Sequence, residues 1–237
     1  PTYELELPSS KQLINYRPFL VKEEKLLVLA LESEDTKQIT TAIKAVIKSC
    51  ILTKGIKVEE LPTFDIEYLF LNIRGKSVGE DVEVNLIAPD DDTTSVPVVI
   101  PIDEIKVVED ENHTNKIKVD DDLMMEMKYP SLDQFIKSNF DFNEDNNMER
   151  SFDLIANCID KIYNEEEVWS TADCTKKEVV GFLEQMNSAQ FKEIEKFFET
   201  MPKLSHTVEL TNPKTKKKST VVSVSYTHLR AHETDRY

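Results

Sequence analysis

The residues best suited to metal binding or catalysis are few in this sequence, and they lie far apart. Of the four histidines, only His228 and His232 have the i, i+4 spacing that would place two imidazoles on one helix face as metal ligands. The odd number and wide spacing of the cysteines argue against a disulfide framework or a zinc site and fit a reducing compartment. These cysteines are Cys50, Cys158 and Cys174. The four glycines form no phosphate-binding motif. We therefore expect no metal and no cofactor.

The last residues of the chain, 224–237, resemble the translation of a sequencing adapter rather than natural protein. The resemblance rests on the run Val224-Ser-Tyr-Thr-His-Leu-Arg-Ala-His-Glu-Thr234. We interpret the histidine pair within this run as accidental, and we expect the natural C-terminus to be missing.

A nucleophilic site needs a Ser, Cys or Thr beside a base. With the tail set aside, only His113 and His206 remain as histidine bases, and the sequence contains no G-x-S-x-G motif. Either histidine could meet a cysteine in space, but a surface histidine without a catalytic role is the favoured interpretation.

Clusters of acidic residues are the other candidates for metal chemistry. Asp141–Asp145 begins like a calcium loop, but Asn146 stands where glycine is needed and Phe152 where the bidentate Glu belongs. We expect a polar turn before a helix there. The runs Asp90–Asp92 and Asp120–Asp122 could bind a divalent ion only if they met, and solvated turns between strands are the favoured interpretation.

Several residues are candidates for binding another protein. A dense basic run on a predicted hairpin tip could dock an acidic partner, or it could be a soluble loop that discourages aggregation. The aromatic stripe of Phe191, Phe197 and Phe198 is either core or partly a surface exposed before assembly. Trp169 lies in a predicted polar connection, where it could either fill part of the core or contact a partner at an interface. The candidate protein-binding residues are Trp169, Phe197, Phe198, Lys214, Lys216, Lys217 and Lys218.

Composition narrows the class of protein. With 237 residues, 40% of them hydrophobic, the chain can bury the core of one large domain or two small ones. Its 29 basic and 45 acidic residues leave a net charge of −16, which disfavours nucleic acid as a partner. The apolar run Leu26–Leu31 is far shorter than the roughly 20 residues of a membrane span, and no signal peptide is visible. We expect a soluble protein made in the cytoplasm.

The first 79 residues predict a helical module with one strand. Thr2–Leu7 alternates like a strand, and Val21–Glu32 predicts a helix with Leu26, Leu27, Ala30 and Leu31 on one side. Asp35 can cap a second helix, and a third should run from about Thr63 to Gly75.

Residues 80–129 predict a small antiparallel β unit. Strand-like segments at Val82–Leu86 and Val96–Ile102 flank a turn-rich stretch, and Ile117–Val119 and Leu123–Lys128 add two short strands.

Residues 130–223 predict helices followed by a hairpin. Apolar residues at helical spacing predict a helix over Met148–Tyr163, and Thr175 with Glu178 forms a capping box for the next one. Another helix should cover Ala189–Glu199, and residues 206–222 predict a terminal β-hairpin. The predicted class is α+β, with domains 1–79, 80–129 and 130–223 before the tail at 224–237.

The order of these segments resembles the baseplate hub subunit and hub assembly family of T-even-like contractile-tailed phages. The most specific similar segments are Tyr16–Leu27 and Asp65–Gly79, and the resemblance spans residues 3–223. Further similar segments are Ala30–Glu32, Lys128–Leu132 and Met201–His206. The resemblance implies a virion structural or assembly protein of the hub that binds other hub proteins, and it implies no catalytic residues.

Some members of that family carry CxxC pairs, typical of zinc knuckles, in the β unit and in the terminal hairpin. The corresponding turns here, Ala88–Asp92 and Thr211–Thr215, contain no cysteine. A metal-free β unit is then expected to depend on its apolar face alone.

The leading interpretation is therefore a non-enzymatic hub component, located in the host cytoplasm during assembly or in the tail baseplate, with no small-molecule substrate. One alternative is a tail-associated hydrolase with a carboxylate or metal-assisted site, which requires acidic residues brought together in a pocket. Another is a DNA-contacting adaptor that uses the loop Lys214–Lys218.

Overall fold

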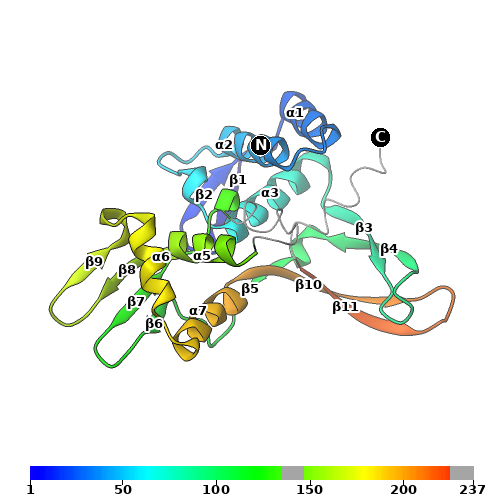
Figure 1. The fold of residues 1–237 in the computed structure, drawn as a ribbon. Helices are drawn as coiled ribbons and strands as arrows, with labels where there is room; N and C mark the ends of the chain where they lie inside the picture. Colours follow the sequence, from blue (N-terminus) through cyan, green and yellow to red (C-terminus); the bar gives the residue numbers. More distant parts are fainter. Residues whose placement is uncertain (135–146, 225–237) are drawn as a thin grey trace. The chain divides into compact units, whose positions relative to one another are not determined.

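The computed structural model describes residues 1–134 and 147–224 and divides the chain into two compact units (Figure 1). Unit 1 combines residues 1–108 with the segment from residue 202 onward, and unit 2 comprises residues 109–201. Both units combine helices with small antiparallel sheets, so the predicted α+β class is confirmed. The predicted domain boundaries stay predictions, but the strands of residues 80–129 are divided among three sheets of the described chain.

Unit 1 begins with a hairpin rather than with a single strand. β1 (Tyr3–Glu6) pairs antiparallel with β2 (Leu13–Tyr16), a strand that the sequence analysis missed. The turn between them is tied to a helix, because the Ser9 backbone N–H donates to the Asp65 carboxylate at 3.0 Å and the Ser9 hydroxyl donates to its other oxygen. The first strand pair is thereby fixed to the helical core.

Three helices form the core of this part of unit 1, as the sequence predicted. They are α1 (Val21–Glu32), α2 (Thr36–Cys50) and α3 (Thr63–Val78), with a short 3-10 turn, η1 (Val58–Glu60), before α3. Asp35 caps α2 by accepting from the Lys37 N–H at 2.8 Å. α3 is buried on most sides and continues through Gly75, where an added Cβ would lie 3.1 Å from Ile102. Gly79, with a φ of 137°, ends the helix.

Two hairpins complete unit 1. β3 (Asp81–Ile87) pairs with β4 (Ser95–Pro101), and η2 (Ile102–Glu104) leads to β5 (Lys106–Val108). The second sheet has the order β11-β10-β5 and contains β10 (Lys203–Thr211) and β11 (Lys218–Val224). The predicted terminal hairpin is confirmed, and its first strand also pairs with a strand about a hundred residues earlier in the chain.

The turns that close the β3–β4 and β10–β11 hairpins have matching backbones. The Asp92 N–H donates to the Ala88 carbonyl at 3.0 Å, and the Lys216 N–H donates to the Asn212 carbonyl at 2.9 Å. Asp92 and Lys216 occupy the same place in their turns, and both have positive φ, 52° and 63°. The two turns therefore share this backbone motif although they differ in sequence. They close at different lengths, since the Ala88 N–H donates to the Thr94 carbonyl and the Asn212 N–H donates to the Lys217 carbonyl.

Side chains join these two turns. The amide of Asn212, whose exposure is 0%, donates to Asp90 at 3.0 Å and to Asp91 at 3.1 Å, and the Thr215 hydroxyl also donates to Asp90. We call these four residues the turn clasp. The expectation that a metal-free β unit depends on its apolar face alone is wrong, because hydrogen bonds centred on the buried Asn212 also hold the two hairpins together.

Unit 2 is a four-stranded antiparallel meander packed against helices. Its sheet has the order β6-β7-β8-β9. Its core contains Met125, Ile159, Leu183 and Ile194, each at 1% exposure or less. The elements in chain order are β6 (Lys116–Lys118), β7 (Met124–Met127), α5 (Asn147–Cys158), β8 (Ile159–Tyr163), β9 (Val168–Ser170), η3 (Thr171–Asp173), α6 (Lys176–Glu184) and α7 (Ser188–Thr200).

The helix predicted over Met148–Tyr163 is correct only for its first part. α5 ends at Cys158, and the next five residues form β8, which pairs with β7 on one side and β9 on the other. Ile159 and Ile162 match a helical spacing, but as β-branched residues they also suit a strand. The polar connection expected around Trp169 is likewise strand β9.

The helix starts of unit 2 follow local sequence signals. The capping box at Thr175 is confirmed, since the Glu178 N–H donates to its hydroxyl at 3.3 Å and the Glu178 carboxylate accepts from the Thr175 N–H at 2.7 Å. At the next helix, Asn187 is the capping residue, and its side chain accepts from the Ala189 N–H at 2.9 Å, so the helix begins at Ser188, one residue before the predicted start.

Candidate functional site

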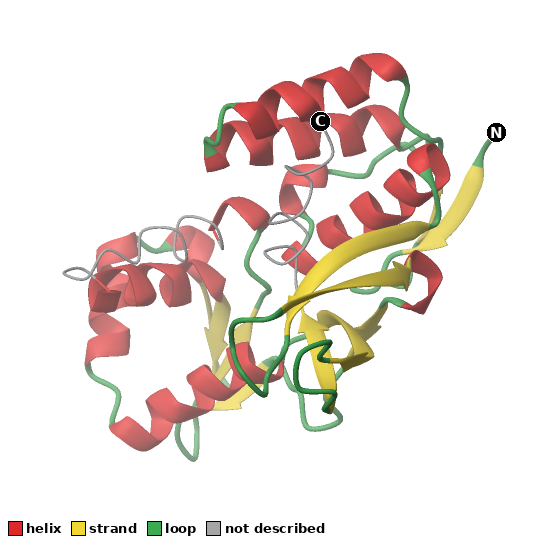
Figure 2. Cartoon of the chain, turned by 90° about the vertical axis from the view of Figure 1, so that its right-hand side faces the viewer, coloured by secondary structure: helices red, strands yellow, loops and turns green. Residues whose placement is uncertain are grey.

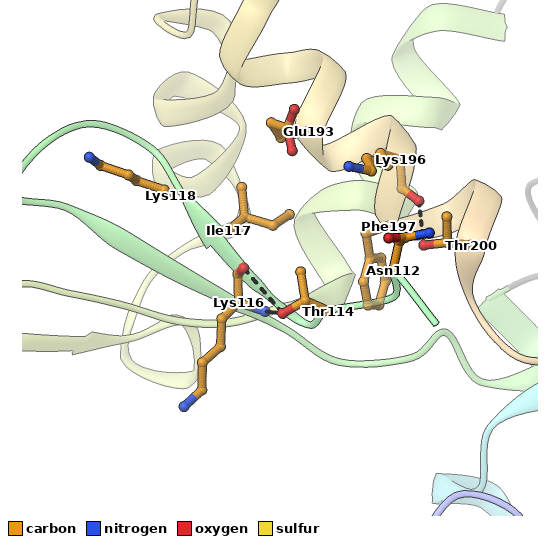
Figure 3. Close-up of a pocket in the computed structure, with 9 residues that line it drawn as sticks. All are labelled: Asn112, Thr114, Lys116, Ile117, Lys118, Glu193, Lys196, Phe197 and Thr200. Carbon is orange, nitrogen blue, oxygen red and sulfur yellow. Dashed lines mark hydrogen bonds between the residues drawn. The ribbon is translucent and has the colours of Figure 1, made fainter. Parts of the chain in front are cut away.

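A pocket of about 250 Å³ lies in unit 2 between β6 and α7 (Figure 3). The aromatic ring of Phe197 forms part of its wall, and the side chains of Lys116 and Lys118 extend away from that ring in Figure 3. Glu193 is the one carboxylate among its described lining residues. A carboxylate-based hydrolase needs acidic side chains that converge, and this pocket does not bring two together.

His113 lies close to this pocket and serves as a hydrogen-bonded link. Its Nδ1 lies 2.9 Å from the Thr200 hydroxyl, its Nε2 lies 2.9 Å from the Tyr129 hydroxyl, and its ring packs on Phe197. Burial lowers the pKa of His113 and so favours the neutral imidazole, despite the opposing charges of nearby acidic residues. The expectation of a surface histidine is corrected, since this side chain is half-buried and joins the start of the meander to α7.

Two of the three cysteines are poorly suited to act as nucleophiles. Cys50 and Cys158 are buried and Cys174 is exposed. Burial raises the pKa of the Cys158 thiol to about 12, and it also raises the pKa of Cys50. Both thiols therefore stay protonated at neutral pH and are poor nucleophiles. The ring nitrogens of His113 contact hydroxyl groups rather than a thiol.

The acidic runs form turns rather than a metal site. Asp90 and Asp91 belong to the turn clasp, and Asp120 accepts from the Asp122 and Leu123 N–H groups at 2.9 and 2.8 Å. Among residues 1–134 and 147–224, no group of three or more His, Cys, Asp or Glu side chains could hold a metal ion. The calcium-loop candidate Asp141–Asp145 lies outside the described residues.

The basic loop lies at the turn between β10 and β11. Its four lysines are all exposed, and they are Lys214, Lys216, Lys217 and Lys218. The turn clasp holds Asp90 and Asp91 against the same turn. These carboxylates reduce the positive potential that the loop would present to a nucleic acid.

The aromatic candidates of unit 2 have different environments. Trp169 is 42% exposed on the edge strand β9, beside Val168 at 65%. Phe197 is 2% exposed and packs against His113 and Phe198, so it belongs to the core of unit 2 and presents almost no surface to a partner. Phe198 is half-buried. Trp169 therefore has the most surface of the three aromatic candidates.

A surface that the sequence analysis missed lies on α1. Val21, Leu26 and Leu29 are 79%, 42% and 53% exposed, although Leu26 was expected on a buried side. α1 and α2 pack side by side as the uppermost helices of Figure 2, and α1 packs mainly against α2. A groove of about 370 Å³ runs between them, which we call the α1–α2 groove. Its lining residues are Leu26, Leu29, Ala30, Lys37, Gln38, Thr41, Ala42 and Ala45.

The sequence did contain a signal for this surface. The run Leu26–Leu31 consists of six apolar residues, which occupy every side of a helix. A helix that packs mainly against one other helix cannot bury all of them, so some stay exposed.

A comparison with protein families identifies the kind of protein. The family model described as T4 bacteriophage base plate protein matches residues 1–228. The chain belongs to this family. The match covers the described residues of both units, and it ends inside the segment that resembles an adapter. Comparisons with curated proteins and with solved structures each found no match.

Membership in the base plate family gives the chain a structural role in the phage tail baseplate. This membership also implies that the chain is located in the baseplate of the virion tail and that its partners are other baseplate proteins. Within the described residues, no helix is both long enough and apolar enough to cross a membrane.

Proposed function

We propose that this base plate protein is a component of the baseplate hub, either permanent or present only during assembly in the host cytoplasm, and that it acts by binding other hub proteins. Family membership and the similarity of Tyr16–Leu27 and Asp65–Gly79 to hub subunits support this role. The observation that carries the binding function is the exposed apolar surface of α1. Large exposed apolar surfaces on soluble proteins mark interaction sites.

We further propose that the protein has no catalytic activity of its own. The α1–α2 groove has no carboxylate among its described lining residues, and the pocket beside α7 has one. The two most buried carboxylates of unit 1 are Glu23 and Asp65. Asp65 accepts from Ser9 in the first hairpin, and Glu23 accepts from Arg17 and from the Leu20 N–H at the start of α1. Both groups thus have structural partners.

Co-purification with the other hub proteins of the same phage tests the binding function. A tagged chain should recover hub proteins from cells that express the baseplate genes, and Leu29→Glu should reduce that recovery because a charge replaces an exposed apolar contact. Val99→Glu is the matched control, since Val99 is 56% exposed on β4 and Leu29 is 53% exposed. The control should leave recovery unchanged.

The hub proposal is wrong if the wild-type chain recovers only baseplate proteins from outside the hub, or none. Mass spectrometry of mature particles separates the two versions of the role. A permanent subunit should be present in every particle, and an assembly protein should be found only in hub precursors.

A further inference from the structure

The α1–α2 groove has a chemistry that selects one kind of partner. Leu26, Leu29 and Ala30 of α1 and two alanines of α2 line it with apolar side chains. Small residues in such a groove allow another backbone to approach closely. Among the described lining residues, Lys37 is the one charged side chain. The groove is therefore an apolar trough with a single basic group on the α2 side.

The charges along α2 extend this basic side. Three lysines and one threonine form one stripe along the helix, because they are spaced four, three and four residues apart. They are Lys37, Thr41, Lys44 and Lys48. Thr36–Cys50 contains no Asp or Glu, although the whole chain has a net charge of −16. Lys48 pairs with Glu59 at 3.1 Å, but both side chains are more than half exposed, so the pair is weak and open to exchange.

An amphipathic helix is the partner that fits both features. Helices bind grooves of this kind by placing apolar residues at i, i+3 or i+4, and i+7 into the trough. Acidic residues flanking that apolar face would lie along the lysine stripe of α2. A strongly basic helix would instead be repelled by Lys37 and its neighbours, and nucleic acid would leave the apolar trough empty.

We propose that the α1–α2 groove binds an amphipathic helix of another protein, with its apolar residues on Leu26 and Leu29 and its acidic residues along the α2 lysines. The identity of that protein as a baseplate component rests on the proposed function. The groove, the charge stripe and the exposed leucines do not depend on it.

Two matched peptides and the full chain test the proposal. Each peptide is an amphipathic helix of about 16 residues with the same Leu and Ala face. One carries Glu and the other Lys at the polar positions, and binding is measured by fluorescence anisotropy. The Glu peptide should bind about tenfold more tightly than the Lys peptide at low salt, and the difference should shrink as salt is raised.

Variants of the groove separate its two contributions. Leu26→Glu should abolish binding of the Glu peptide, and Lys37→Glu should narrow or reverse the preference between peptides. Val99→Glu should change neither. Circular dichroism and thermal melts check that each variant folds, and Leu29→Ser provides a second, uncharged disruption of the trough.

Equal binding of the two peptides, tighter binding of the Lys peptide, or no binding of either overturns the proposal. Binding that survives both Leu26→Glu and Leu29→Ser also overturns it, because the peptide would then occupy another surface. These outcomes are distinct from failure of the hub function. A chain that recovers hub proteins but does not prefer the Glu peptide keeps its function and loses this site.

Discussion

At the residue scale, two buried carboxylates show how partners decide the charge state of a group. Glu23 is 5% exposed, and Asp65 is fully buried. Burial alone would raise the pKa of Glu23, but hydrogen bonds from Arg17 at 3.0 Å and the Leu20 N–H at 2.7 Å outweigh it and lower the pKa to about 2. At Asp65, burial raises the pKa by more than the neutral hydrogen-bond donors of Ser9 lower it. The direct hydrogen bond from the Arg17 guanidinium distinguishes Glu23 from Asp65, where the charge of Lys11 also lowers the pKa but does not outweigh burial.

Glu23→Gln should destabilise unit 1 and reduce its sensitivity to acid. The change removes a buried charge pair with Arg17 and should cost about 2 kcal/mol at neutral pH. Because the folded pKa of Glu23 lies below its ordinary value of 4.5, this stabilisation is present above about pH 4.5 and is lost as the pH falls towards 2. The measurement is urea unfolding between pH 2 and pH 7.

Glu24→Gln is the matched control for this change, since it removes one negative charge from the neighbouring position of α1. It should alter the free energy of unfolding by less than about 0.5 kcal/mol. Equal losses for the two variants would show that the net charge of α1, and not the Arg17–Glu23 pair, accounts for the effect.

At the scale of elements, the turn clasp joins two hairpins that are far apart in sequence. Asn212 reaches Asp90 and Asp91 across a separation of more than 120 residues. Here an amide, a hydroxyl and two carboxylates bridge the turns, so hydrogen bonds connect the two hairpins.

Asn212→Ala should destabilise unit 1 by about 2 kcal/mol, because a fully buried amide is lost and its carboxylate partners are left with fewer donors. Hydrogen exchange should show faster opening of β3–β4 and of β10–β11 together. Lys214→Ala, an exposed change in the same turn, should leave the stability within about 0.5 kcal/mol of wild type. If only the β10–β11 hairpin loosens, the clasp does not couple the two hairpins.

At the scale of the whole molecule, the two units are built differently from the chain. Unit 2 is one continuous segment with its own core, which includes Met125, Ile159 and Phe197. Unit 1 is assembled from two separated segments, because β10 and β11 complete a sheet with β5. This arrangement makes folding of unit 1 depend on residues from both ends of the chain.

A fragment of residues 109–201 should therefore fold alone, and a fragment of residues 1–108 should not. The first contains every residue of the unit 2 core. The second lacks β10, which pairs with β5 and contacts β4, and it also lacks β11, which pairs with β10. Cooperative thermal unfolding followed by circular dichroism checks both. A cooperative transition in the fragment 1–108 would show that β10 and β11 are dispensable for unit 1.

The net charge of −16 also acts at this scale. Repulsion between copies of an acidic chain opposes their association through the exposed apolar surface of α1. The lysine stripe of α2 is a local exception to that charge, and it lies beside the groove where a partner is proposed. General repulsion and local attraction then act on different surfaces of one protein.

The sequence by itself determined the structures that depend on near neighbours. The capping box at Thr175 and Glu178, the strand Val82–Leu86 and the terminal hairpin were all predicted, and the structure confirms them. Each is stabilised by hydrogen bonds or side-chain alternation within a few residues, so the local pattern contains the needed information. The family resemblance was also readable from the sequence, because it rests on the order of whole segments.

Only the tertiary structure decided what distant segments do to one another. Ile159 and Ile162 suit a helix and a strand equally, and pairing with β7 and β9 makes them a strand. The clasp around Asn212 depends on partners that no local pattern connects. The run Leu26–Leu31 is apolar on every side of its helix, so the sequence does not indicate which side is buried. Packing of α1 against α2 alone determines that Leu26 and Leu29 remain exposed and that a groove forms beside them.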